Sequence, residues 1–211
     1  VDEYAIWVKG ISFVNITDAE LDNTTYESAE NKFLANDIPK AIEGFKKYIQ
    51  AFPEGLHTLQ ANFYLAQLLV KTNLEEDAIA NYQYVLALPQ SEISEEALNK
   101  LSQILLEKEQ WATAIPLLER LEQEANLPLN IVYAQSNLMK GYYQSQEYNK
   151  AVNYAEKILL QDKIDAIVEY DSKIIIARSA FQTEDLPKAE EFYTEVERNA
   201  NGELKAEALY Y

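Results

Sequence analysis

The chain contains one short phrase twice: residues 37–41 read DIPKA, and residues 185–189 read DLPKA. The two copies lie four steps of about 37 residues apart. The alanine that ends each copy also recurs between them, at spacings of 37, 36, 37 and 38 residues, as Ala41, Ala78, Ala114, Ala151 and Ala189. Such a period is typical of stacked helical repeats, each of which buries its apolar face on its neighbours. The sequence therefore predicts an all-α solenoid rather than one globular core.

The composition limits the class of partner. The 211 residues are 48% hydrophobic, which argues against disorder, and they include only 5 Gly and 6 Pro, too few for a turn-rich β fold. The formal net charge is -17, so we expect neither nucleic-acid binding nor attraction to anionic lipid. No run of about 18 apolar residues predicts a membrane span. The absence of cysteine excludes disulfides and thiolate sites.

Each period is interpreted as two amphipathic helices. In one unit the first helix is predicted over residues 58–71 and the second over residues 74–88, before Pro89. At the start of the array Thr17 precedes Glu20 by three residues, which is the pattern of a capping box. We therefore expect a helix that begins there and extends to Leu34.

The period also predicts the domain organisation. We expect the tail of a truncated preceding repeat and a linker over residues 1–16, an array over residues 17–203, and the start of a truncated further repeat over residues 204–211. Both ends resemble cuts within repeats, so we expect a fragment of a longer chain, whose exposed solenoid ends could self-associate. The five expected units of the array are 17–54, 55–91, 92–128, 129–165 and 166–203.

The repeated phrase is explained by helix formation. Asp37 can accept from free backbone N–H groups as an N-cap, and Pro39 falls in the first helical turn, where no N–H is needed. Lys40 is expected to point outward. Ala41 is expected where the two helices of a unit approach most closely. The same roles are predicted for the second copy, residues 185–189.

These residues resemble tetratricopeptide repeats, in which each helix of a pair carries a small residue at a fixed position. On the first helices that position falls on Ala29, Ala66, Ser102, Met139 and Ala177. The period of 36–38 exceeds the family's usual 34, and the family's tryptophan and turn glycine are missing. The resemblance implies a right-handed superhelix of stacked antiparallel helix pairs. The long period is also similar to that of bacterial cell-envelope relatives, such as the outer-membrane lipoprotein that assists barrel assembly.

The resemblance further implies a concave groove, lined by the first helices, that holds a partner segment. The candidate partner-binding residues are Tyr26, Phe33, Phe63, Gln67, Lys140, Tyr143, Arg178 and Phe181. Lys140 and Arg178 lie one unit apart and suit a carboxylate of an extended peptide, with the aromatic side chains as anchors. The alternative is that these aromatic side chains pack against the next unit.

Nothing in the sequence indicates catalysis. The only histidine, His57, lies in a loop and is expected at the surface. The carboxylates of residues 75–77 and 190–191 fall at helix starts or on outward faces, where they favour the helix dipole and water. No phosphate-binding loop or nucleophile triad occurs. We therefore predict no enzyme activity, no catalytic residue, no cofactor and no metal.

The predicted function is a non-enzymatic scaffold or adaptor that binds a protein or peptide segment. Two alternatives remain open. One is a cell-envelope assembly factor of the repeat-lipoprotein type, and the other is a regulatory array fused to a catalytic or signalling domain outside this fragment. The sequence does not decide the compartment, although the resemblance favours the periplasm or cell envelope over the cytoplasm.

Overall fold

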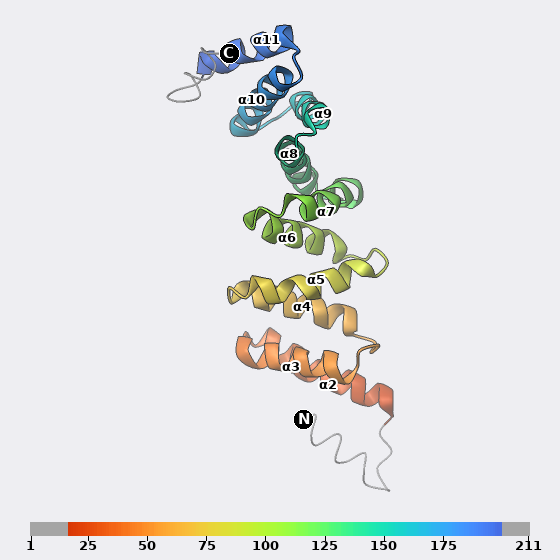
Figure 1. Ribbon diagram of the computed structural model, residues 1–211. Helices are drawn as coiled ribbons and strands as arrows, with labels where there is room; N and C mark the ends of the chain where they lie inside the picture. Colours follow the sequence, from red (N-terminus) through yellow and green to blue (C-terminus); the bar gives the residue numbers. More distant parts are fainter. Residues whose placement is uncertain (1–16, 200–211) are drawn as a thin grey trace, which may run out of the picture. The chain divides into compact units, whose positions relative to one another are not determined.

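The computed structural model describes residues 17–199, and this part of the chain is all-α, without a strand. The expected segments 1–16 and 204–211 lie outside the described residues. Short turns join the helices into consecutive pairs (Figure 1). The helices are α2 (Asp18–Leu34), α3 (Ile38–Ala51), α4 (Thr58–Lys71), α5 (Glu75–Ala87), α6 (Ser94–Glu107), α7 (Trp111–Glu124), α8 (Pro128–Gln144), α9 (Tyr148–Leu159), α10 (Ala166–Gln182) and α11 (Leu186–Asn199).

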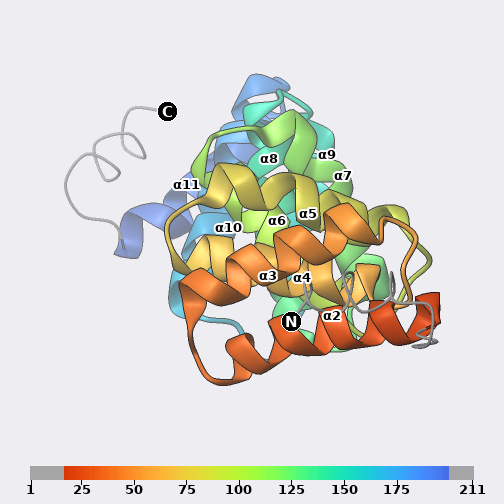
Figure 2. The ribbon, with the colours of Figure 1, turned by 90° about the horizontal axis from the view of Figure 1, so that it is seen from below.

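The contacts divide the chain into two compact units, with the boundary between Ala97 and Leu98, inside α6. In unit 1, α3 packs against both α2 and α4, and α4 packs against α5. Figure 2 shows α2 and α3 side by side. In unit 2, each helix from α7 to α11 packs on the next one, and α8 also contacts α10. Each unit therefore contains first and second helices of consecutive pairs, as expected for a solenoid of helix hairpins.

The predicted helix boundaries are largely confirmed. The first helix predicted over residues 58–71 is α4, and its predicted partner is shortened by one residue at each end to α5. The capping box is present: Thr17 Oγ1 accepts from the backbone N–H of Glu20 at 3.2 Å, and Glu20 Oε2 accepts from the backbone N–H of Thr17 at 2.8 Å. Two otherwise unsatisfied donors are thus paired at the start of α2.

The small residues that set the period lie in the core. All five anchor alanines are buried, with exposed fractions from 0% at Ala41 to 3% at Ala189. A close approach of α2 and α3 lies at Gly44: an added Cβ there would be 2.9 Å from Ala29 Cβ and 3.1 Å from Ala29 Cα. The two backbones are therefore held close by a glycine and an alanine, whereas the close approach expected at Ala41 stays a prediction.

The predicted capping role of Asp37 is wrong. Its side chain makes no capping bond to α3, and instead Asp37 Oδ2 lies 2.8 Å from Lys40 Nζ. The hydrogen bond from Lys40 lowers the pKa of this carboxyl. In the second copy Asp185 Oδ1 does accept from the backbone N–H of Lys188, at a long 3.4 Å. The Lys188 side chain does not simply point outward, because its Nζ lies 2.5 Å from Glu156 Oε1 on α9.

The turns within the helix pairs share an unusual backbone conformation. In each of them one residue that is not glycine has a positive φ, between 55° and 61°. These residues are Asn36, Asn73, Glu109, Gln146 and Glu184. They occupy the turn position where the tetratricopeptide pattern has glycine. The left-handed conformation is tolerated best by glycine and then by asparagine, so three of the five turns are strained.

Candidate partner-binding faces

The predicted aromatic residues of unit 1 are mostly packing residues. Tyr26 on α2 and Phe63 on α4 are buried, at 5% and 3% exposed. Phe33 is half-buried and stacks on Tyr64, with ring centroids 4.5 Å apart. The rings of Phe63 and Tyr82 pack edge to face, with their centroids 6.4 Å apart. These contacts tie α2 to α4 and α4 to α5, which leaves little of Tyr26 or Phe63 for a partner.

A polar contact joins consecutive first helices in unit 1. Gln67 Nε2 on α4 donates to Glu96 Oε1 at the start of α6, at 2.7 Å. Gln67 is half-buried and Glu96 is exposed. The predicted partner-binding residue Gln67 thus already has a hydrogen-bond acceptor on the neighbouring first helix.

Unit 2 repeats this relationship with charged groups. Lys140 Nζ on α8 lies 2.6 Å from Asp171 Oδ2 on α10, and both side chains are partly exposed, at 43% and 30%. Gln67 and Lys140 hold equivalent positions in their helices, as do Glu96 and Asp171. The same two positions therefore bridge successive first helices in both units. In unit 1 the bridge joins a neutral amide to a carboxylate, and in unit 2 it joins two opposite charges.

The other predicted residues of unit 2 lie on the same surface. Arg178 on α10 is equivalent to Lys140 on α8, and these two helices are in contact. Tyr143 and Phe181 follow the two cations by three residues, so each shares a helix face with its cation. All are half-buried, and the ring of Tyr143 meets Tyr148 edge-on at 5.7 Å. We define the α8–α10 face as Lys140, Tyr143, Asp171, Arg178 and Phe181.

His57 is not a free surface residue, contrary to the expectation from the sequence. Its ring stacks on Tyr26 with centroids 4.3 Å apart, and its Nε2 lies 2.7 Å from Asn23 Oδ1. Its backbone N–H donates to the hydroxyl of Tyr48 at 2.9 Å. The loop that precedes α4 is therefore held against α2, through contacts between residues 31 and 34 positions apart that the sequence pattern did not reveal.

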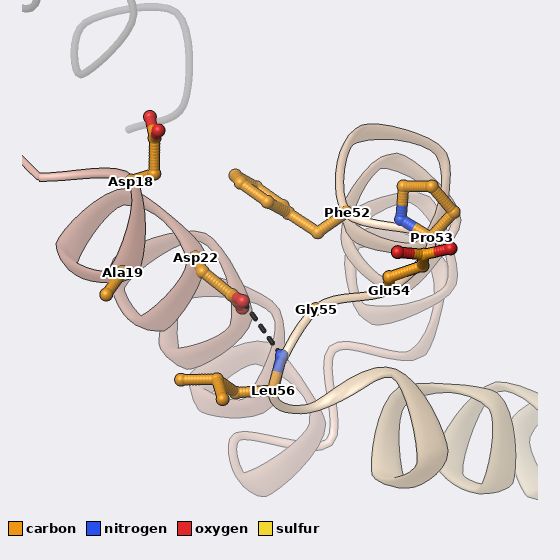
Figure 3. A pocket seen from close by; sticks show the side chains of 8 residues that line it. All are labelled: Asp18, Ala19, Asp22, Phe52, Pro53, Glu54, Gly55 and Leu56. Carbon is orange, nitrogen blue, oxygen red and sulfur yellow. Dashed lines mark hydrogen bonds between the residues drawn. The ribbon is translucent and has the colours of Figure 1, made fainter.

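Buried Asp22 organises the same loop. Tyr48 OH donates to Asp22 Oδ1 at 2.5 Å. The backbone N–H of Leu56 donates to Asp22 Oδ2 at 2.9 Å, as the dashed line in Figure 3 shows. Burial and the Asp22 hydrogen bond raise the pKa of Tyr48 to about 12. Because both carboxylate oxygens have donors, this cluster has a structural role. Among residues 17–199, no group of His, Asp or Glu side chains could hold a metal ion.

An open pocket of about 660 Å³ lies beside this cluster. Figure 3 shows its wall, made by the first turns of α2 and by the loop after α3. The wall combines apolar and acidic side chains around Gly55. The lining residues are Asp18, Ala19, Asp22, Phe52, Pro53, Glu54, Gly55 and Leu56.

Another polar cluster lies in unit 2, where it joins α7, α8 and α9. Glu122 Oε1 on α7 accepts from Gln135 Nε2 at 2.9 Å and from Lys157 Nζ, and its Oε2 accepts from Tyr154 OH at 2.8 Å. Burial raises the pKa of Glu122, but these hydrogen bonds together lower it by more, so the pKa lies below its ordinary value. Sequence reasoning missed this cluster. The only available signal was the opposite charge of Glu122 and Lys157, 35 residues apart, close to one period.

The stacked helix pairs, with small residues buried at the same position of each unit, define a tetratricopeptide-like fold of helical hairpin repeats. None of the described helices is long and apolar enough to cross a membrane. No family model and no curated protein matches the chain. The comparison with solved structures supports the fold.

Several solved structures share this tetratricopeptide-like fold. One is YrrB, described as a TPR protein with an unusual peptide-binding site: 16% identity over 89% of this chain and 91% of that one, with a TM-score of 0.62. A tetratricopeptide repeat protein from Parabacteroides merdae matches at 15% identity over 84% and 66%, with a TM-score of 0.57. MamA from Desulfovibrio magneticus matches at 16% over 89% and 100%, with a TM-score of 0.53. At these identities the likeness concerns the fold.

Proposed function

We propose that this protein is a non-enzymatic interaction module, and that the α8–α10 face of unit 2 binds an extended segment of a protein partner. The observation that carries the proposal is the arrangement of two cations and two half-buried aromatic rings on adjacent helices, in a chain with a net charge of -17. Aromatic and arginine side chains are enriched among the residues that dominate binding energy. The peptide-binding site described for YrrB is consistent with such a use of the fold.

The expected ligand is a peptide with a carboxylate beside an apolar side chain. Arg178 already makes an interaction within the fold, so a carboxylate that its guanidinium binds through two parallel N–H donors has to share or replace that contact, whereas Lys140 offers a point charge. Tyr143 and Phe181 can contact the neighbouring apolar group. Asp171 already neutralises Lys140, so an incoming carboxylate has to compete with Asp171 for that ammonium group.

The experiment is a selection of binding peptides followed by charge reversal. A random 12-residue peptide library displayed on phage is selected on the immobilised full chain, and the affinities of the selected peptides are measured by fluorescence anisotropy. The double variant Lys140→Glu/Arg178→Glu should weaken the carboxylate-containing peptides by at least about tenfold, which corresponds to roughly 1.4 kcal/mol.

The matched control is Lys150→Glu/Lys163→Glu, which makes the same change in net charge within unit 2. Both control lysines are exposed and lie outside the α8–α10 face. The control should bind within about twofold of the parent chain, because screened charges at a distance contribute little. Equal losses in the two double variants would show a general charge effect, and unchanged binding in Lys140→Glu/Arg178→Glu would refute the proposed face.

A further inference from the structure

The loop between α3 and α4 is anchored to the fold by hydrogen bonds. Tyr48 OH donates to one oxygen of buried Asp22. The backbone N–H of Leu56 donates to the other oxygen (Figure 3). Thr58 Oγ1 donates to the backbone carbonyl of Gly55 at 2.9 Å. An added Cβ at Gly55 would lie 2.5 Å from Tyr48 OH, so the loop packs directly on this cluster and presents its side chains in a fixed arrangement.

This anchored loop exposes an apolar side chain beside the open pocket. Leu56 is 73% exposed, although its backbone is fixed by the bond to Asp22. Ala19, Phe52 and Pro53 belong to the same lining. Figure 3 shows Phe52 and Leu56 extending from the loop toward α2. A leucine kept in water forgoes the free energy that burial of its side chain would give. A ligand with an apolar side chain recovers that free energy without the cost of ordering the loop.

The lining is acidic as well as apolar. It contains Asp18, Asp22 and Glu54, and no basic residue is among the described residues that line the pocket. Both hydrogen-bond donors to Asp22 are uncharged, so they do not cancel its negative charge. Asp18 already makes an interaction within the fold, and Glu54 is exposed. The charge of the lining therefore favours a ligand that carries a cation.

We propose that this pocket binds a segment of a partner protein in which an apolar side chain stands one or two positions from a lysine or an arginine. The apolar side chain packs on Leu56 and Phe52, and the cation lies beside Glu54. The volume of about 660 Å³ falls within the roughly 300–1,000 Å³ of pockets that hold small ligands, so it can accept two such side chains. This site belongs to unit 1 and does not depend on the function proposed for unit 2.

Other occupants fit the lining less well. A second copy would bring mostly like charge, because the chain has 35 acidic and 18 basic residues. A metal ion lacks ligands, since both oxygens of Asp22 already accept hydrogen bonds and the side chains of residues 17–199 form no metal-binding group. A nucleic acid or an anionic lipid would be repelled by the carboxylates. A basic segment of another protein is therefore the occupant that the charges favour.

The test is a peptide selection directed at this pocket. Random 12-residue peptides displayed on phage are first depleted on the immobilised Leu56→Ser chain and are then selected on the parent chain. The retained peptides should carry a lysine or an arginine within two positions of an apolar residue. In fluorescence anisotropy, Leu56→Ser should weaken their binding at least about tenfold, because it removes apolar contact area. Glu54→Lys should weaken it at least about threefold, because it reverses a nearby charge.

The matched controls change equivalent side chains elsewhere. Leu160→Ser replaces an 85% exposed leucine of unit 2, and Glu92→Lys reverses an exposed glutamate in the loop after α5. Both should bind the retained peptides within about twofold of the parent chain. Lys140→Glu/Arg178→Glu should also stay within about twofold, which separates a failure of this inference from a failure of the function proposed for unit 2. Circular dichroism of Leu56→Ser should show the helix content of the parent, because the backbone hydrogen bond is kept.

Three results would overturn the inference. One is that no peptide survives the selection, or that lysine and arginine are not enriched among the retained peptides. Another is that the retained peptides bind Glu54→Lys as tightly as the parent chain, a result that does not depend on the folding of Leu56→Ser. The last comes from light scattering: a mass that rises with concentration in the parent chain and not in Leu56→Ser would assign the pocket to a second copy.

Discussion

Lys140 on α8 forms an ion pair with Asp171 on α10, with 2.6 Å between Nζ and Oδ2. The cation that the sequence assigns to a partner is thus already paired within unit 2. The equivalent residues in unit 1, Gln67 and Glu96, are joined by a hydrogen bond of 2.7 Å. The two bridges connect consecutive first helices. A ligand can open the Lys140–Asp171 ion pair of unit 2 at moderate cost, because partly exposed ion pairs contribute only about 0.2–1 kcal/mol to stability.

Asp171→Asn should therefore tighten the binding of peptides that carry a carboxylate. The substitution removes the internal competitor for Lys140 while it keeps the size of the side chain. We expect a two- to fivefold lower dissociation constant, the equivalent of about 0.4–1 kcal/mol. Fluorescence anisotropy with the selected peptides measures it. Weaker binding in Asp171→Asn would mean that the aspartate itself contacts the partner.

Glycine should stabilise the turns that now contain strained residues. Glu109, Gln146 and Glu184 have φ values of 55° to 61°, a region in which a Cβ is unfavourable. Each substitution by glycine should raise the free energy of unfolding by about 0.5–1 kcal/mol in urea titrations. Asn36→Gly should change it less, because asparagine tolerates this region.

The control for these turns is Lys46→Gly, at an exposed position in the interior of α3. Here glycine should lower the free energy of unfolding by about 0.5–1 kcal/mol, because it adds backbone entropy to the unfolded chain. If the turn substitutions destabilised the protein as Lys46→Gly does, the assigned turn conformation would be incorrect.

Two close-packed glycines within helices, Gly44 of α3 and Gly141 of α8, should respond differently to alanine. In Gly44→Ala the new methyl group meets the Cβ and the Cα of Ala29 at 2.9 and 3.1 Å, so two helix backbones have to separate. We expect a net loss of about 1–3 kcal/mol despite the better helix propensity of alanine. In Gly141→Ala the new methyl group meets side-chain atoms of Ile115 and Trp111 at 3.1 to 3.3 Å, which can shift. The loss should therefore be smaller, as thermal melting of the two variants can show.

Tyr48→Phe should destabilise unit 1, because it leaves one oxygen of buried Asp22 without its donor. The expected loss is about 1–3 kcal/mol at neutral pH. In the parent chain, the pKa of Tyr48 is raised from 10 to about 12 by folding. The contribution of the Tyr48 hydroxyl to the free energy of unfolding is therefore complete below pH 10 and is lost as the pH rises toward 12. Urea titrations across this range should show a smaller alkaline decline in Tyr48→Phe than in the parent, and an equal decline would contradict this assignment.

The Glu122 cluster predicts the opposite pH dependence. Folding lowers the pKa of Glu122 below its ordinary 4.5, so its contribution is present above that pH and is lost as the pH falls through the lower folded value. Lys157→Met removes one donor and should cost about 1 kcal/mol near neutral pH. The difference between parent and variant should shrink when unfolding is measured at pH values below 4.5. Lys163→Met, at an exposed loop position, should show neither effect.

Much of the fold follows from local signals in the sequence. Thr17 and Glu20 mark the start of α2 because a capping box involves only neighbouring residues. Ala41 and its counterparts give the period because close-packed helices need small side chains at fixed intervals. The prediction for Asp37 failed because Lys40, three residues later, competes with the backbone N–H groups for the same carboxylate.

The candidate site was less predictable. The pairing of Lys140 with Asp171 could have been inferred, since opposite charges fall on facing positions of successive first helices once the register is known. The burial of Tyr26 and the stacking of His57 on it could not, because they depend on how the loop before α4 folds back onto α2. Contacts of this kind join residues about 30 positions apart and leave no periodic signal.

The most direct test of the proposed function is site-specific photo-cross-linking. A photoreactive phenylalanine analogue replaces Tyr143 on the α8–α10 face or, in a control variant, Tyr84, an exposed tyrosine of α5. A selected peptide that binds the parent chain should cross-link from position 143 and not from position 84, and an excess of unlabelled peptide should suppress the product. Cross-linking from position 84 with none from position 143 would contradict the claim that this face binds the partner.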